Sequence, residues 1–234
     1  MKKEKTMPVY EVAPQEDCFR VLRNERGLMT PKGATYDLPT QKLAQAIAAE
    51  WQAQEDKIDP STMPLTQLAA TTLDILAKER EKIVDCLLAF TRSELLCHRT
   101  ERDGSLSERQ QAVWQPVLDW CSASYGASFC LTCGVMPTEK REKTDQALRR
   151  PLEACNDFWL TGVRHAAETA GSLVLGLALA ERHLTAEQVF EASELDVLHQ
   201  TESWGKDPVT QGRHKAVRFD LEVCEKWFSL LRAV

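Results

Sequence analysis

The spacing of apolar residues changes after Leu38, and this change limits what the chain can fold into. Between Val9 and Leu38, short β-leaning segments alternate with turn signals at Asn24–Gly27 and Pro31–Gly33. The pattern predicts a small antiparallel sheet with strands near residues 8–37, and glycines at the turn positions that favour positive φ. A sheet of this size is only marginally stable alone, so it must pack against a helix or further strands.

From Pro39 onward, apolar residues recur three and four positions apart, which predicts helices. Thr40 can cap the first helix, and Trp51 ends its apolar stripe, where we expect the indole to close the core. The run from Ala170 to Ala180 is apolar on all sides and predicts a buried central helix. It has about half of the roughly 20 residues that a membrane-spanning helix needs, so we expect no membrane insertion. Helical spacing continues at residues 65–76, 83–90, 107–124, 152–170 and 185–204, and again after residue 207.

Local signals predict where several helices begin, bend and end. Pro116 lies inside a helical stripe, so that helix bends there or a new one begins. Thr185–Gln188 has the pattern of a capping box and predicts a helix running to Trp204, with Gly205 as its stop. Asp207–Pro208 supplies a cap and a first-turn proline for the last helix.

Two further short apolar segments, residues 94–99 and 127–133, are bounded by polar or glycine residues and predict strands. Pro137 interrupts the chain, and the pattern after it is helical. The sequence therefore predicts an α+β fold. An N-terminal α+β domain with a small antiparallel sheet would span residues 1–136, and a multihelical C-terminal domain would span residues 137–234.

The charge balance and the cysteines restrict the class of partner and the compartment. The chain has 29 Lys and Arg against 35 Asp and Glu, a net charge of −6, so we expect no nucleic-acid partner. Its 8 cysteines lie mostly in apolar stretches, and a chain of 234 residues needs no disulfides to hold a core. The N-terminus has no apolar stretch typical of a secretory signal. We therefore expect a cytoplasmic protein.

The sharpest chemical motif is Cys130-Leu-Thr-Cys133, which has the spacing of a redox pair or of half a zinc site. A redox pair would need a helix N-terminus, but Gly134 to Pro137 is a poor helix start. The other cysteines and the 5 histidines supply no second pair of zinc ligands, and we find no nucleophile elbow, P-loop or dinucleotide fingerprint. We therefore predict no catalytic residue, no metal, no cofactor and no enzyme activity. The residues leave open a thiol-disulfide oxidoreductase that uses Cys130 and Cys133.

Acidic residues gather on the predicted helix that begins near Thr185. They are Glu187, Glu191, Glu194, Asp196 and Glu202. A solvated helix face and a protein-binding face both fit this pattern.

Several of these segments, taken in order, resemble the ATP-twelve chaperones, which are assembly factors for the catalytic sector of F-type ATP synthase. The resemblance covers nearly the whole chain, because matching segments occur in the right order and spacing. They are LPTQKLAQAIAAEWQAQ (38–54), MPLTQLAATTLD (63–74), ELLCHR (94–99), RQQAVWQPVLDW (109–120) and LHQTESWG (198–205).

The resemblance implies a non-catalytic chaperone that binds the unassembled alpha subunit until the beta subunit replaces it. Asp196, Gln200 and Trp204 match the C-terminal motif of the family, whose function depends in part on acidic residues there. This chain departs from the motif, because Leu198 stands where an acid is usual. We therefore predict a partner-binding surface made of Asp196, Leu198, Gln200, Glu202 and Trp204, on a monomer. A scaffold that binds a different protein is the remaining alternative.

Overall fold

The computed structural model describes residues 8–55, 57–100, 104–133, 142–204 and 207–232. The chain divides into two compact units, Met1–Glu79 with Trp227–Val234, and Arg80–Lys226. The first change of unit coincides with Glu79, whose φ of −121° and ψ of 19° interrupt α3 (Ala77–Ala89). The domain boundary expected at residues 136 and 137 lies outside the described residues and stays a prediction.

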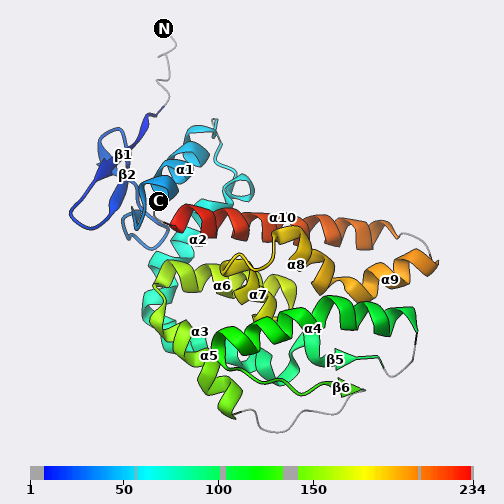
Figure 1. Ribbon diagram of the computed structural model, residues 1–234. Coiled ribbons are helices and arrows are strands. Elements are labelled where there is room, and N and C mark those ends of the chain that lie inside the picture. The colour runs from blue at the N-terminus through cyan, green and yellow to red at the C-terminus, as the bar shows by residue number, and fades with distance from the viewer. Residues whose placement is uncertain (1–7, 56, 101–103, 134–141, 205–206, 233–234) are drawn as a thin grey trace. The chain divides into compact units, whose positions relative to one another are not determined.

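The first unit contains the predicted antiparallel sheet, beside α1 in Figure 1. The central strand β2 pairs with each of the other three strands, and its longest pairing, with β1, runs from Tyr10 opposite Arg23 to Pro14 opposite Phe19. Helix α1 packs on β1 and β2, which gives the small sheet the cover that it needs. The strands are β1 (Tyr10–Pro14), β2 (Phe19–Arg23), β3 (Arg26–Gly27) and β4 (Asp37–Leu38).

The turn between β2 and β3 differs from the sequence expectation. Positive φ falls on Asn24 (48°) and Glu25 (64°), the two residues between the strands, and not on Gly27, which lies in β3. A two-residue hairpin turn requires positive φ at both central residues to match the right-handed twist of its strands. The turn geometry therefore places positive φ at Asn24 and Glu25, although neither is a glycine. Gly33, with φ of 86°, is where a glycine was expected.

Helix α1 of the first unit begins at the predicted cap. The Thr40 side chain accepts from the amide of Leu43 at the start of α1 (Gln41–Gln52), and its Oγ1 donates to the Leu230 carbonyl at 2.6 Å. Trp51 is only half-buried, so the expectation that it closes the core is corrected. After α1 come a 3₁₀ turn η1 (Pro60–Thr62), α2 (Pro64–Thr71) and a π-helical segment η2 (Thr72–Leu76).

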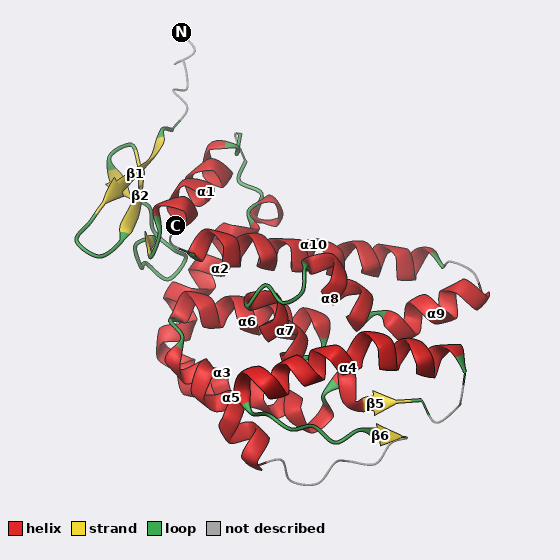
Figure 2. Cartoon of the chain, in the orientation of Figure 1, coloured by secondary structure: helices red, strands yellow, loops and turns green. Residues whose placement is uncertain are grey.

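The second unit is almost entirely helical, as Figure 2 shows. Helix α7 is fully buried, as the apolar run predicts, and it packs against α4, α6 and α8. A Cβ at Gly176 would lie 2.9 Å from the Ala167 amide nitrogen, so glycine allows α6 and α7 to approach closely. The helices after α3 are α4 (Ser105–Tyr125), α5 (Glu142–Ala154), α6 (Asp157–Ala170), α7 (Leu173–Ala180), α8 (Ala186–Ser193), α9 (Leu195–Trp204) and α10 (Pro208–Leu231).

The two extra strands predicted at residues 94–99 and 127–133 are mostly wrong. Glu94 caps a 3₁₀ turn, η4 (Leu95–Cys97), by accepting from the Leu96 amide, so the apolar part of the first segment is not extended. Only β5 (His98–Arg99) and β6 (Thr132–Cys133) pair, and they run parallel. Short apolar runs do not distinguish a strand from a buried turn.

Helix boundaries in the second unit follow side-chain caps more than apolar spacing. Asn156 accepts from the Trp159 amide at 2.8 Å and starts α6, which divides the helix expected over 152–170. The capping box of Thr185 and Gln188 is confirmed, but α8 ends at Ser193 and α9 begins at Leu195. Helix α4 continues through Pro116.

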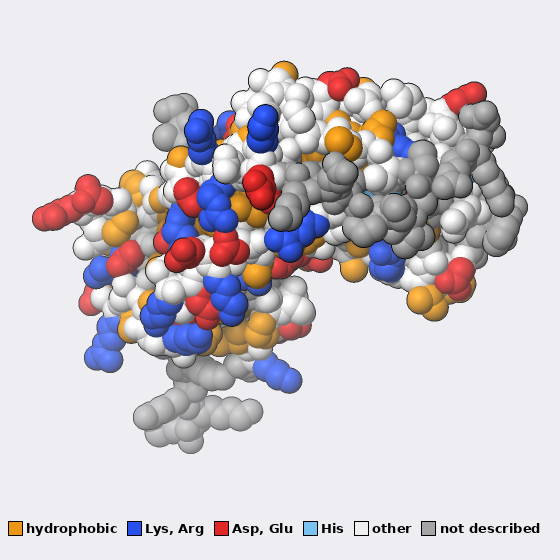
Figure 3. Space-filling model, turned by 90° about the horizontal axis from the view of Figure 1, so that it is seen from below, with side chains coloured by type: hydrophobic (Ala, Val, Ile, Leu, Met, Phe, Trp, Pro, Cys, Tyr) orange, Lys and Arg blue, Asp and Glu red, His pale blue; other side chains and the backbone are white. Residues whose placement is uncertain are grey.

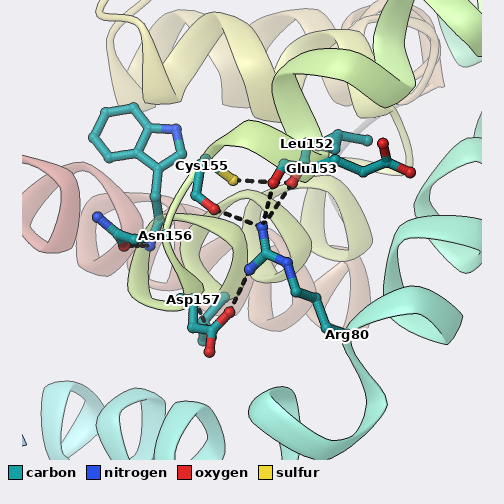
Figure 4. A network of polar contacts seen from close by, with 8 residues as sticks. Arg80, Leu152, Glu153, Cys155, Asn156 and Asp157 are labelled. Carbon is teal, nitrogen blue, oxygen red and sulfur yellow. Dashed lines mark hydrogen bonds and ion pairs between the residues drawn. The ribbon is translucent and has the colours of Figure 1, made fainter.

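Arg80 fastens the joint between α5 and α6, as Figure 4 shows. One guanidinium nitrogen donates to the carbonyls of Leu152 (3.1 Å), Glu153 (3.0 Å) and Cys155 (2.5 Å), and the other pairs with Asp157. The last carbonyls of a helix have no hydrogen-bond partner within the helix. A cation at this position donates to them and is attracted by their partial negative charge. The short connection is therefore held in one conformation.

Candidate functional site

The predicted contact helix α9 packs on α4 through polar side chains. Gln110 Nε2 donates to Asp196 at 2.9 Å, and Arg109 forms a bidentate ion pair with Glu202 at 2.8 to 2.9 Å. Ser105 Oγ lies 3.1 Å from His199 Nε2. The two acids that sequence reasoning assigned to a partner therefore bond within the chain. We call these contacts the α4–α9 seam.

Gln110 is the fixed point of this seam. Its side chain is 2% exposed, and its Oε1 accepts from the Thr100 amide at 2.9 Å while its Nε2 reaches Asp196. Both ends of the amide are thus satisfied, which a buried amide requires. The arrangement holds Asp196 in one orientation.

Trp114 extends the seam toward α8. The indole is 1% exposed, and its Nε1 donates to the Ala192 carbonyl at 2.8 Å, near the end of α8. The Arg99 guanidinium lies 5.1 Å from the centre of the ring, within cation–π range. The segment RQQAVW thus contacts both α8 and α9.

Other acids of the predicted acidic face also have partners inside the second unit. Arg218 forms two bonds of 2.6 and 2.7 Å with Glu187, and Arg213 pairs with the buried Glu194. Hydrogen bonding to Arg218 lowers the pKa of Glu187, and hydrogen bonding to Arg109 lowers that of Glu202. The acidic cluster is therefore largely neutralised by arginines of α4 and α10.

The remaining predicted contact residues differ in exposure. Gln200 is exposed and Leu198 is half-buried. The side chain of Trp204 and all of Gly205 lie outside the described residues. Of the α9 side chains that the structure describes, Gln200 and Glu202 are exposed, and Glu202 is already paired with Arg109.

Glu94 is a buried acid that sequence reasoning placed in a strand and gave no role. It is 1% exposed, and its carboxylate accepts from the Ser172 hydroxyl and, at 3.5 Å, from the Val174 amide at the N-terminus of α7. Burial raises its pKa to about 7 against the opposing effect of these hydrogen bonds. Two features of the sequence could have indicated this contact: Glu94 lies beside an apolar stretch, and Ser172 precedes the apolar run of α7.

The described cysteines behave as core or surface residues. Burial raises the pKa of Cys121 to about 12 and also raises that of Cys224, so both thiols stay protonated and inert. Cys130 is exposed, and no helix begins between it and Cys133, whose side chain lies outside the described residues. Among the residues that the structure describes, no group of three or more possible ligands could hold a metal ion.

On the face drawn in Figure 3, Lys and Arg side chains intermingle with Asp and Glu, and neither sign forms a broad patch. None of the described helices combines the length and the apolar character needed to cross a membrane.

Comparison with known proteins decides the family. The family model for the ATP12 chaperone protein matches residues 4–122. The chain belongs to the ATP12 chaperone family. This is the ATP-twelve family that the sequence segments resemble, and the chain is accordingly a chaperone.

Solved structures of this ATP12 family match along the chain. The crystal structure of Atp12 from Paracoccus denitrificans is 30% identical, with a TM-score of 0.90 over 95% of this chain and 96% of that chain. A Paracoccus Atp12p mutant with one aspartate changed to lysine matches at 30% identity and TM-score 0.91, over 95% of each chain. A chaperone candidate from Agrobacterium tumefaciens matches at 30% identity and TM-score 0.88, over 95% of this chain and 84% of that chain. The α+β class with a small N-terminal antiparallel sheet and many following helices is therefore confirmed.

Proposed function

We propose that this chaperone binds the unassembled alpha subunit of F-type ATP synthase and supports assembly of the catalytic sector. The observation that carries the proposal is membership of the ATP12 family, together with a match to Paracoccus Atp12 over 95% of the chain. We expect the protein to act in the cytoplasm as a monomer without a bound cofactor.

The physical need for such a chaperone follows from the state of its client. A subunit without its neighbours exposes an apolar interface, and such a surface self-associates unless it is covered. The chaperone must release the alpha subunit to the beta subunit, so its contact should be of modest affinity with a polar rim.

The proposal is tested by co-purification of the tagged chaperone with alpha alone, beta alone, or both. We expect alpha to be retained, its light scattering during refolding to fall, and added beta to release it. Recovery of beta in place of alpha would contradict the partner assignment. Suppression of aggregation for any unfolded protein, without preference for alpha, would contradict its specificity.

We also propose that α9 contributes to partner binding, as the sequence predicts. Lysine substitution at Asp196 and Glu202 is a poor test, because Asp196 bonds to the buried Gln110 and its loss would disturb the seam, while a lysine at position 202 would face Arg109. Gln200→Lys changes an exposed side chain instead, and Gln211→Lys, on an exposed position of α10, is its matched control. Capture should weaken only in the first variant, and equal capture by both would place the contact elsewhere.

A further inference from the structure

The first unit has an apolar groove that is separate from the α4–α9 seam. We call it the N-terminal groove; it has a volume of about 280 Å³. Met29 and Ile58 at its mouth are 51% and 45% exposed, although they come from segments far apart in the sequence. Its lining includes Met29, Pro31, Tyr36, Trp51, Ile58 and Met63. Large apolar side chains exposed together mark an interaction site more often than scattered ones do.

Two carboxylates form hydrogen bonds with the segments that make the walls of this groove. Glu50 accepts from the amides of Leu65 (2.9 Å) and Thr66 (2.8 Å) at the start of α2. Asp74, in the π-helical segment η2, accepts from the Thr30 hydroxyl at 2.6 Å. Since α2 and the loop at Thr30 are held in place, the groove exists before any occupant arrives, which lowers the entropic cost of binding.

Trp51 supplies an unused hydrogen-bond donor in the wall of the groove. Its ring packs against Tyr10 at a centroid distance of 5.8 Å, and its Nε1 is buried with no acceptor among the described residues. Buried donors almost always have an acceptor, so an unpaired one needs an explanation. Because this nitrogen is buried, a carbonyl or carboxylate in the groove would reach it only after neighbouring side chains move.

The rim of the groove is basic. Arg23 and Arg26 line an adjoining hollow of about 620 Å³ that shares Met29, Trp51 and Ile58 with the groove. Within the described part of the chain, neither arginine pairs with a carboxylate, and both are exposed. Glu25 lies between them in the turn but does not line the hollow. Two arginines with no carboxylate partner among the described residues therefore lie beside an apolar groove, in a chain of net charge −6.

Size and charge select among possible occupants. At about 280 Å³ the groove falls just below the roughly 300 to 1,000 Å³ usual for small-molecule sites, and it suits one or two side chains of a docking segment. The chain's own residues 1–7, MKKEKTM, carry three lysines and one glutamate, so the basic rim would repel them. An acidic and apolar segment of another protein fits both the rim and the groove.

We propose that the N-terminal groove binds a segment of the alpha subunit in which an apolar side chain adjoins one or two acidic residues. The apolar side chain enters between Met29, Trp51 and Ile58, and the acids lie against Arg23 and Arg26. This proposal rests on the proposed function, because it names where and by what chemistry the client is held. It adds a contact in the first unit to the one expected on α9.

Two double variants of the full chain test the groove and its rim separately. Met29→Asp with Ile58→Asp puts acid into the groove, and Arg23→Glu with Arg26→Glu reverses the rim. Each should weaken alpha capture by about tenfold or more, as loss of a central anchor does. The rim variant should also make capture less sensitive to salt.

Matched controls keep the change in net charge the same. Val113→Asp with Val209→Asp adds two acids at exposed apolar positions of α4 and α10. Arg92→Glu with Lys215→Glu reverses two exposed cations elsewhere. Both controls should capture alpha like the wild type. Circular dichroism and urea unfolding check that every variant folds. If the Met29→Asp, Ile58→Asp variant does not fold, the milder variant Met29→Gln with Ile58→Ser is used in its place.

A photo-crosslinking residue in place of Ile58, with one in place of Val209 as control, identifies the occupant directly. We expect a crosslink from position 58 alone, to a segment of alpha that contains an apolar residue beside Asp or Glu. A crosslink to a second copy of the chain, or to residues 1–7 of the same chain, would overturn the proposal. Wild-type capture of alpha with no effect of the groove variants and no crosslink would overturn it while leaving the proposed function intact. Failure of the wild type to capture alpha would reject the proposed function and, with it, this occupant.

Discussion

The α4–α9 seam and the N-terminal groove depart from the usual distribution of residues in opposite ways. At the seam, Gln110 and Asp196 are polar groups taken from solvent, and both have partners within the chain. At the groove, Met29 and Ile58 are apolar groups left in solvent without cover. The first arrangement stabilises the fold, whereas the second leaves free energy to be gained by binding.

This difference shows why charge alone is a weak guide to a contact surface. The acids of α8 and α9 attract attention in the sequence, but arginines of α4 and α10 neutralise most of them. The groove has no charge pattern in the sequence, because its lining comes from separate segments. The following predictions test the contrast by asking which of these groups stabilise the fold.

The largest effect should come from the buried acid Glu94. Its pKa rises from an ordinary 4.5 to about 7, so the folded protein binds the proton more tightly than the unfolded chain. Below pH 4.5 the protonated acid makes its full contribution to the free energy of unfolding, and this contribution is lost as the pH rises to about 7. At roughly 1.4 kcal/mol per pH unit, the loss in unfolding free energy is about 3 kcal/mol. Urea unfolding of the wild type and Glu94→Gln from pH 4.5 to 8 should show this loss only in the wild type. Parallel profiles for the two proteins would contradict it.

A smaller effect is expected at the seam itself. Gln110→Leu removes the hydrogen bonds that join Gln110 to the Thr100 amide and to half-buried Asp196, which costs about 1 to 3 kcal/mol of unfolding free energy. Gln115→Leu is the control on the same helix, because within the described residues the exposed Gln115 side chain bonds to Asp119 one turn away. Its cost should stay within about 0.5 kcal/mol in the same urea titration. Equal costs would mean that the seam amide is no more important than a surface one.

The strained turn beside the groove rim should respond in the other direction. Glu25 has φ of 64°, and glycine adopts this conformation without the steric penalty, so Glu25→Gly should stabilise the protein by about 0.5 to 1 kcal/mol. Asn24→Gly should not, because the Asn24 side chain accepts from the Val9 amide at 3.0 Å. Thermal unfolding of the two variants measures the difference, and a destabilised Glu25→Gly protein would contradict this view of the turn.

The smallest effect is expected for the exposed ion pair of the seam. Arg109 and Glu202 are both solvated, and exposed pairs contribute little to stability because water and salt screen them. Glu202→Gln should therefore leave the midpoint of thermal unfolding unchanged at low and high salt. A clear shift would place this pair with the buried contacts and weaken the contrast between seam and groove.

Much of the fold could be predicted because its signals are local. The cap at Thr40, the capping box at Thr185 and the apolar run of α7 each depend on a few neighbouring residues, and each is found as expected. The strands predicted at residues 94–99 and 127–133 were mostly wrong, because Glu94 accepts from backbone amides of a turn and of a distant helix. Periodicity contains no information about such long-range acceptors.

For the two candidate sites too, local features could be predicted from the sequence and long-range contacts could not. Residues of α9 could be selected from family-like segments, but their bonds to Gln110 and Arg109 depend on how α4 and α9 pack. The groove could not be predicted at all, since Met29, Trp51 and Ile58 meet only after the sheet, α1 and the following loop have folded. Trp51 was expected in the core, and local sequence contains no signal that its Nε1 has no acceptor among the described residues.

The division of the chain also sets an order for its synthesis. The second unit is one continuous stretch, Arg80–Lys226, and it leaves the ribosome before Trp227–Val234, which belong to the first unit. The buried Trp227 and Phe228, and the carbonyl that bonds Thr40, therefore reach the first unit last. Because units tend to fold as their residues emerge, the helical unit can fold before the C-terminal segment of the sheet unit, Trp227–Val234, has been synthesised. The unit that carries the groove is thus the later of the two to be completed on a newly made chain.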